Sequence, residues 1–430
     1  MRFLFVTTSF APRGSSAAVR TVHMAKCLVE QGHDVHVLTY VEAMLTLFSG
    51  QDEALSNKVP EAVGVTRIQG GPLRRRVFGR SSAQTGEASK TKERLKKNSL
   101  VSLLVPDPHV DSVPAFIREG NKLLESFKPD VIVSFAYPFS MHWVGSALKR
   151  RSPHLKWIAD YGDPWVGSPV VELPRPAWRQ RLDYWIERRW LAAADWVSVT
   201  THPTQLLYEQ EFPFLKEKIL VAPMGFDPED FESIAPKQRS PELQGKVLLV
   251  HTGRIYPQAR DPSPFVQALE KLAQRAPANF AAVKVVLVGE GDDHVRRLTE
   301  NSSAKEAFVF VPWVPVEESI AWMKAADWLL LFGNKGGVQI PGKVFQYFGS
   351  GGRIFMPKIV ASDPTADIVG SVEGSVVTRN DSEEIYRELL KISAVAEAGG
   401  ARGAPGADSK YSWQSVVRSV VRTLATGKVA

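Results

Sequence analysis

The chain has 430 residues, more than one typical hydrophobic core organises, so two domains are expected. Its composition, 44% apolar and 23% charged, is that of a globular protein; the single cysteine, Cys27, excludes an intrachain disulfide, and the absence of a long apolar run argues against a membrane span. Residues 67–97 hold ten Lys/Arg and two Glu, a charge of +8, whereas the whole chain carries +7, so the rest of the chain is about neutral. The basicity belongs to one segment, which argues against a general nucleic-acid-binding surface.

The first half of the chain alternates predicted strands and helices. "RFLFVTT" is a short apolar run typical of a buried strand, and it is followed by a loop and by apolar residues at helical spacing between Val19 and Val29. "HDVHVLTY" returns as a strand, which makes a βαβ unit with parallel pairing. Further strands are predicted at 129–136, 156–162, 194–201 and 217–225.

The second half repeats this pattern after a polar stretch rich in proline. Strands are predicted at 246–254, 282–291, 307–314 and 326–333, separated by helical segments. We therefore expect two α/β domains with a ligand at the carboxyl ends of their strands, in a cleft between them. The predicted organisation is a first domain at 1–226, a linker at 227–245, a second domain at 246–408, and a final helix at 409–430.

Two loops are candidates for binding phosphate. "PRGSSAAVR" (12–20) follows the first strand and opens a helix, where backbone N–H groups and the helix dipole favour an anion. It lacks the GxGxxG pattern, so a nicotinamide cofactor is not supported. "HTGRIYPQAR" (251–260) carries Arg254 and Arg260 after a strand, and two guanidiniums suit a diphosphate. The alternatives are an ordinary strand–helix turn and a pair of solvated arginines.

The stretch "WIADYGDPW" (157–165) holds two carboxylates near the end of a predicted strand. Asp160 and Asp163 stand near the carboxyl end of that strand, where a carboxylate can act as a general base. Alternatively, they cap turns around Gly162 and Pro164.

The stretch "VQIPGKVFQYFGSGG" (338–352) predicts a helix with Pro341 in its first turn. Lys343 lies at the unfavourable end of its own helix dipole, which makes sense if a phosphate lies in front of it. Gln346 is one turn further on. The alternative is that Lys343 extends to water and Gln346 fills space.

These pieces together resemble the GT-B-fold glycosyltransferases of the large family 4 type, which are retaining nucleotide-sugar enzymes. The resemblance is carried by the first 39 residues, "ILVAPMGFDPEDF", "HTGRIYPQAR", "VVLVGEGD", "VPWVPVEESIAWMKAADWLLL" and "IPGKVFQYFGSGGRIF", in the family's order over both domains. The resemblance implies two Rossmann-like domains facing a central cleft, with a C-terminal helix that crosses back to the first domain.

The resemblance also implies roles for particular residues. Arg254 matches the family's phosphate-binding arginine, and Arg260 stands where many members have lysine. Val314 falls where a backbone group usually meets the nucleobase, and Gly14 and Ser15 match the first-domain loop near the diphosphate. No metal and no cofactor are needed if Arg254, Arg260, Lys343 and helix N-termini stabilise the departing diphosphate.

The sequence departs from the family at three places. The paired glutamates, eight positions apart, fall on Val338 and Gln346, so both carboxylates are absent. Gly162 sits where the family has a histidine, for which Asp163 or Asp160 could substitute, and Met224 replaces the usual Asn. We expect a cytoplasmic glycosyltransferase that moves a sugar from a nucleotide diphosphate-sugar to an acceptor hydroxyl. The alternatives are a nucleotide-sugar epimerase of the same fold and a non-catalytic partner subunit.

The basic segment 67–97 is followed by apolar residues up to 105. This combination suits an anionic membrane surface, and the acceptor could then be a lipid-linked sugar. The protein would in that case be peripheral at the inner membrane face. A solvated loop is the alternative.

Overall fold

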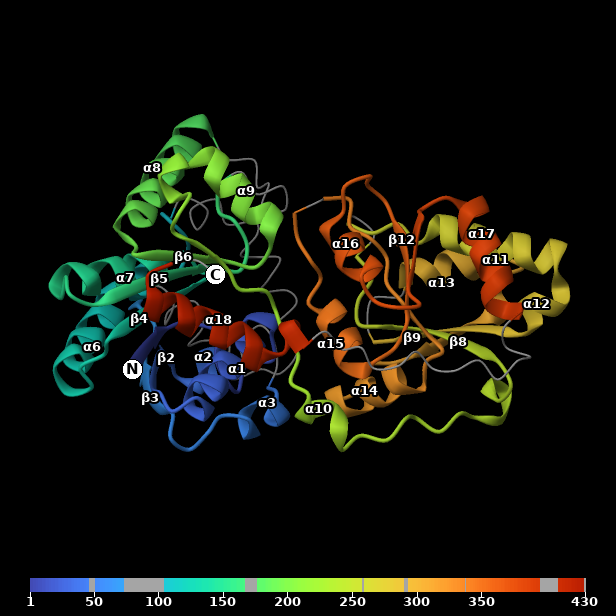
Figure 1. Ribbon diagram of the computed structural model, residues 1–430, viewed down its shortest axis with the longest axis horizontal. Coiled ribbons are helices and arrows are strands. Elements are labelled where there is room, and N and C mark those ends of the chain that lie inside the picture. The colour runs from blue at the N-terminus through green and yellow to red at the C-terminus, as the bar shows by residue number, and fades with distance from the viewer. Residues whose placement is uncertain are drawn as a thin grey trace. The chain divides into compact units, whose positions relative to one another are not determined.

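A computed structural model describes residues 1–45, 51–72, 104–166, 176–256, 259–289, 293–336, 338–394 and 409–428. It divides into two units, which Figure 1 shows as ribbons. The first unit combines Met1–Pro223 with Trp413–Ala430, and the second is Met224–Ser412. Each unit is built on one parallel sheet.

In the described part of the first unit, seven parallel strands form a sheet in the order β3-β2-β1-β4-β5-β6-β7. The order reverses between β1 and β4, which makes that point the topological switch of the sheet. The strands are β1 (Arg2–Val6), β2 (Asp34–Tyr40), β3 (Gly64–Ile68), β4 (Val131–Ala136), β5 (Lys156–Tyr161), β6 (Trp196–Val199) and β7 (Ile219–Val221).

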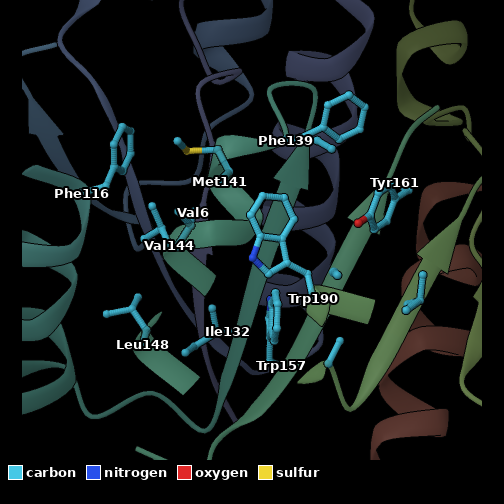
Figure 2. Packing of buried hydrophobic residues seen from close by; sticks show 14 of the residues in the cluster. Val6, Phe116, Ile132, Phe139, Met141, Val144, Leu148, Trp157, Tyr161 and Trp190 are labelled. Atoms are coloured by element: carbon cyan, nitrogen blue, oxygen red, sulfur yellow. The ribbon is translucent and has the colours of Figure 1, made fainter. Parts of the chain in front are cut away.

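Large aromatic and branched side chains fill the core between this sheet and its helices. Trp157 and Ile132 come from neighbouring strands, and Figure 2 shows them beside Leu148 and Trp190, which helices supply. The Trp157 indole N–H donates to the Ser134 hydroxyl at 2.8 Å, so its one polar atom is satisfied inside the core.

The helices of the first unit include one from the far end of the chain. α18 (Trp413–Thr426) packs on α1 (Ser16–Glu30), where the Trp413 and His23 rings stack at 5.6 Å and Gln31 donates to the Gln414 carbonyl (Figure 1). The expected return of the C-terminal helix to the first domain is therefore confirmed. The other helices are α2 (Glu42–Leu45), α3 (Glu53–Asn57), α6 (Val113–Ser126), α7 (Ser140–Arg151), α8 (Ala177–Ala193) and α9 (His202–Glu211).

In the described residues of the second unit, six parallel strands form a sheet in the order β10-β9-β8-β11-β12-β13. Its order reverses between β8 and β11. The strands are β8 (Val247–Thr252), β9 (Val283–Val288), β10 (Phe308–Val311), β11 (Trp328–Leu330), β12 (Ile354–Lys358) and β13 (Val376–Arg379).

Helices cover both faces of the second sheet, as the two separate apolar clusters of this unit indicate. The segment expected as a linker, 227–245, contains α10 (Glu229–Glu232) and a short 3-10 turn at Pro241–Leu243, and Phe231 of α10 packs in the core. The other helices are α11 (Ser263–Arg275), α12 (Pro277–Ala281), α13 (Asp293–Thr299), α14 (Val316–Ala325), α15 (Lys343–Ser350), α16 (Pro364–Gly370) and α17 (Ser382–Ala394).

The start of α15 differs from the prediction. Pro341 lies outside the helix, one residue before the N-cap Gly342, and its carbonyl accepts from the Val344 N–H as part of a turn. The helix ends at Gly351, whose φ of 72° is the left-handed conformation that glycine adopts readily. Among the described residues, no helix is long and apolar enough to cross a membrane.

Candidate functional site

The candidate site lies in the second unit at the carboxyl end of β8, next to the switch point of the sheet. The strand ends at Thr252, and Gly253 turns the chain with φ 82°. Gly289, after the neighbouring strand β9, approaches so closely that a Cβ there would lie 3.1 Å from the Gly253 Cα. This close contact and the φ of 128° at position 289 both favour glycine there.

Lys343 brings its ammonium to the end of β8. Nζ lies 2.6 Å from the Thr252 carbonyl oxygen and 2.9 Å from Nε2 of His251. The other ring nitrogen of His251, Nδ1, lies 2.9 Å from the Leu330 carbonyl, which can only accept, so Nδ1 carries the proton and Nε2 accepts from Lys343. An ammonium has three N–H groups, and these two contacts leave one for a ligand.

Burial shapes the charge of this pair. It lowers the pKa of His251 well below its ordinary value, and the Lys343 charge acts in the same direction, so the imidazole is neutral. Burial also lowers the pKa of Lys343 well below its usual range, and the neighbouring Arg260 charge adds to this. An anion bound in front of Lys343 would offset both effects.

Arg260 is buried near the same strand end, with 8% of its surface exposed. Its Nε donates to the Asn334 side-chain oxygen at 3.0 Å, and its Nη1 donates to the Arg254 carbonyl at 3.3 Å. Burial lowers the pKa of Arg260. In the described part of the chain, neither Arg260 nor Lys343 forms an ion pair. The side chain of Arg254 is exposed, with its guanidinium 5.8 Å from the Tyr256 ring centre.

Tyr347 fixes α15 against the sheet. Its hydroxyl accepts from the Thr252 N–H at 3.1 Å and donates to the Leu330 carbonyl at 3.2 Å, so one side chain joins the ends of β8 and β11. Burial raises the pKa of Tyr347 to about 12. The N–H groups of Val344 and Phe345 bond to turn carbonyls, whereas those of Gly342 and Lys343 have no partner in the described structure.

The other second-unit residues predicted to bind the nucleotide-sugar, Gln346 and Val314, have no described contact with the end of β8. Gln346 lies one turn after Lys343, is half-buried, and makes no side-chain hydrogen bond to the described residues. Val314 is half-buried after β10 and packs on the apolar cluster under the sheet. The structure thus brings Arg254, Arg260 and Lys343 to one strand end, and no described contact joins Val314 to them.

In the first unit, the predicted loop residues begin α1. Ser15 is the N-cap, and its Oγ accepts from the Ala18 N–H at 3.2 Å. Gly14 is half-buried beside it. This is the ordinary construction of a helix N-terminus, and it leaves the role of the loop toward a diphosphate as a prediction.

Asp160 and Asp163 occupy different environments. Asp160 lies inside β5 and is 1% exposed, with its two oxygens 3.1 and 2.7 Å from Nε and Nη2 of Arg20. Side chains alternate along a strand, and this register turns Asp160 toward α1 and away from solvent. We therefore assign Asp160 a structural role. Asp163, two residues beyond the strand, is exposed, and its catalytic role stays a prediction.

A further buried carboxyl lies on α8. Glu187 accepts from the Tyr208 hydroxyl at 2.6 Å and from the Val166 N–H at 3.0 Å. Burial, together with a smaller effect of the nearby Asp183 charge, raises its pKa to about 8 despite these hydrogen bonds.

A family comparison covers most of the first unit. Residues 16–225 match the family model described as "Glycosyl transferase 4-like domain". Over these residues the chain is similar to a glycosyl transferase 4-like domain. No curated protein sequence matches the chain.

Solved structures show a likeness in fold that extends over both units. A glycosyltransferase from Rickettsia africae aligns with a TM-score of 0.60 at 10% identity, covering 98% of this chain and 97% of that chain. Sucrose-phosphate synthase from Thermosynechococcus elongatus aligns with a TM-score of 0.64 at 14% identity over 100% of both chains. The N-terminal domain of trehalose-6-phosphate phosphatase from Candida albicans gives 0.59 at 13% identity, covering 99% and 96%. Together these confirm the predicted GT-B fold.

Three residues of the site were not predicted from the sequence. His251, Asn334 and Tyr347 hold Lys343, Arg260 and the β8 end in place. His251 carried a signal, because it is a polar residue inside an apolar run that ends in Thr-Gly-Arg. Asn334 and Tyr347 had no local signal, since their partners lie 74 and 95 residues away.

Proposed function

We propose that this chain transfers a sugar from a nucleotide diphosphate-sugar to an acceptor hydroxyl, with retention of configuration and without a metal ion. The observation that carries the proposal is the pair of basic side chains, half-buried Lys343 and buried Arg260, which form no ion pair among the described residues. The nearby charge of Asp363 acts on Arg260 and offsets part of its burial. Holding two like charges near each other and partly out of water costs free energy that a bound dianion would offset. A diphosphate fits, because its oxygens accept from an ammonium and a guanidinium together.

The same cations would act in the reaction. When the bond between the sugar and the diphosphate breaks, negative charge grows on the departing phosphate oxygen. Lys343, held by His251 and Thr252 before any ligand arrives, needs no reorganisation to stabilise that charge. Exposed Arg254 would add a further guanidinium at the same strand end.

The remaining donor contacts follow from family register. Gln346 would hold the ribose, since its amide can both accept and donate, and a backbone group at Val314 would meet the base. In the first unit, the loop at Gly14 and Ser15 would approach the diphosphate, and Asp163 would stabilise the transition state electrostatically. The acceptor would be held by the first unit.

A lipid-linked acceptor and the membrane surface at 67–105 remain predictions. Residues 73–103 lie outside the described residues. Arg67, the first basic residue of the segment, lies in β3 and pairs with Glu42 at 3.3 Å, so it is bound within the first unit.

The test is a two-step assay. Thermal shifts with UDP, GDP, dTDP and ADP identify the nucleotide, and the matching labelled nucleotide-sugar is then incubated with and without a panel of acceptors. Transfer that requires an acceptor supports the proposal. Conversion of the donor without an acceptor would identify an epimerase instead. Nucleotide binding without any turnover would identify a non-catalytic partner subunit, the alternative suggested by the missing glutamates at Val338 and Gln346. A Lys343→Met variant serves as the control, because any true turnover should fall with it.

A further inference from the structure

Helix α8 buries charged residues beside its apolar ones and leaves two large aromatic residues exposed. Both of its acids, Asp183 and Glu187, are buried, together with Arg179, which donates to Asp183 at 2.7 Å. The charged pair thus faces the protein interior. Two tryptophans, which surface helices usually turn inward, remain on the outside.

The exposed side of α8 consists of tryptophan and arginine. Trp178 and Trp185 are each 54% exposed and stand seven residues apart, which places them on the same side of a helix. Arg181, Arg188 and Arg189 are exposed within the same arc. We call these five residues the α8 face.

The fold extends the α8 face with one more aromatic residue. Phe214, in a 3-10 turn after α9, is 40% exposed, and the Arg188 guanidinium lies 5.8 Å from its ring centre. The Arg189 guanidinium lies 4.9 Å from the Trp185 ring centre. In the part of the chain that the structure describes, none of the three arginines of the face forms an ion pair. Aromatic and cationic groups therefore alternate across this surface, and its cations have no acidic partner among the described residues.

We propose that the α8 face docks on an anionic lipid bilayer, lying along the headgroup layer. Indole rings place their apolar body and single N–H at the boundary between headgroups and acyl chains. Guanidiniums bind the phosphate oxygens of headgroups in pairs, and clustered basic residues are attracted to the negative surface potential of an anionic leaflet. Both chemistries occur together on the α8 face.

The shape of the face favours a bilayer over a nucleic acid. The face is the convex side of one helix of 17 residues, about 25 Å long, which can lie flat on a plane. Proteins that bind single strands instead use a groove that follows the backbone and stacks successive bases on aromatic rings. Two indoles two helical turns apart, about 10 Å, are too far apart to stack neighbouring bases. This proposal rests on neither the sugar-transfer activity nor the basic segment at 67–97.

The experiment is sedimentation of the full chain with vesicles of phosphatidylcholine alone and of phosphatidylcholine with phosphatidylglycerol, at low and high salt. One variant carries Arg181→Gln, Arg188→Gln and Arg189→Gln, and a second carries Trp178→Ala and Trp185→Ala. A third carries Arg150→Gln, Arg151→Gln and Arg422→Gln, which removes the same charge from exposed positions on α7 and α18. Unchanged thermal melting confirms that each variant folds.

We expect the parent to prefer anionic vesicles. The arginine variant of the α8 face should lose more than about tenfold in affinity at low salt, whereas the matched control should change little. The tryptophan variant should bind more weakly at both salt concentrations, because burial of indole is not screened by ions.

Three results would overturn the proposal. These are equal binding to neutral and anionic vesicles, equal losses for the α8-face and control arginine variants, and tighter binding to an RNA duplex that depends on the arginines but not on Trp178 and Trp185.

Discussion

The buried pair between Arg20 and Asp160 gives the most direct prediction about the first unit. The change is Asp160→Asn, which keeps the size of the side chain and removes its charge. Arg20 then stays buried, with 4% of its side chain exposed and no carboxylate against its guanidinium. It keeps its hydrogen bond to the Pro223 carbonyl at 3.1 Å.

The expected cost follows from this geometry. Removing one partner of a buried ion pair typically costs about 3–5 kcal/mol, because the remaining charge loses its compensation. The asparagine oxygen can still accept one of the two hydrogen bonds from Arg20, so we expect the lower end, about 3 kcal/mol. The double variant Arg20→Met with Asp160→Met should recover much of that loss, since no unpaired charge remains.

The assay is urea unfolding of the three proteins at neutral pH, with turnover measured in parallel. A loss below about 1 kcal/mol for Asp160→Asn, the range of solvent-exposed pairs, would refute the reasoning. Loss of turnover with unchanged stability would instead return Asp160 to a catalytic role.

Other positions give shorter predictions. Asp163→Asn should cut turnover strongly while leaving nucleotide affinity and stability nearly intact, and turnover within about twofold of the parent, under ~0.5 kcal/mol in barrier, would remove the assignment. Because burial raises the pKa of Glu187 to about 8 from 4.5, the folded chain holds a proton that the unfolded chain releases, so stability is lost as pH rises across that window. In the parent, the free energy of unfolding in urea should fall by up to about 1.4 kcal/mol per pH unit in this window, and Glu187→Gln should abolish the fall. A difference in unfolding free energy between variant and parent that stays constant with pH would contradict this. Gln346→Ala should weaken nucleotide binding by about 0.5–1.5 kcal/mol in calorimetry, and Gln346→Glu should restore it; an alanine variant that binds like the parent would exclude the ribose contact.

Much of the fold was predictable because its strands are buried on both faces and therefore read as continuous apolar runs. The strands that the sequence analysis did not predict are β3, β12 and β13. β3 and β13 are short edge strands with polar residues, and β12 contains Pro357, which argues against a strand when read from sequence alone.

The site was less predictable because its residues act through distant partners. Arg254 and Arg260 follow an apolar strand, so their position at its carboxyl end could be predicted. That Lys343 reaches the same strand end depends on His251 and Tyr347, which no local pattern connects to it. The burial of Asp160 could not be predicted either, since its partner Arg20 lies 140 residues away in the chain.

The central claim, that Arg254, Arg260 and Lys343 bind a diphosphate, is tested most directly by calorimetry on Arg254→Ala. A charged hydrogen bond contributes about 1.5–3 kcal/mol, so the variant should bind the nucleoside diphosphate identified by thermal shift roughly tenfold or more weakly than the parent. It should bind the matching nucleoside, which lacks phosphates, with nearly the affinity of the parent. Equal losses for the two ligands would contradict a phosphate role for this strand end.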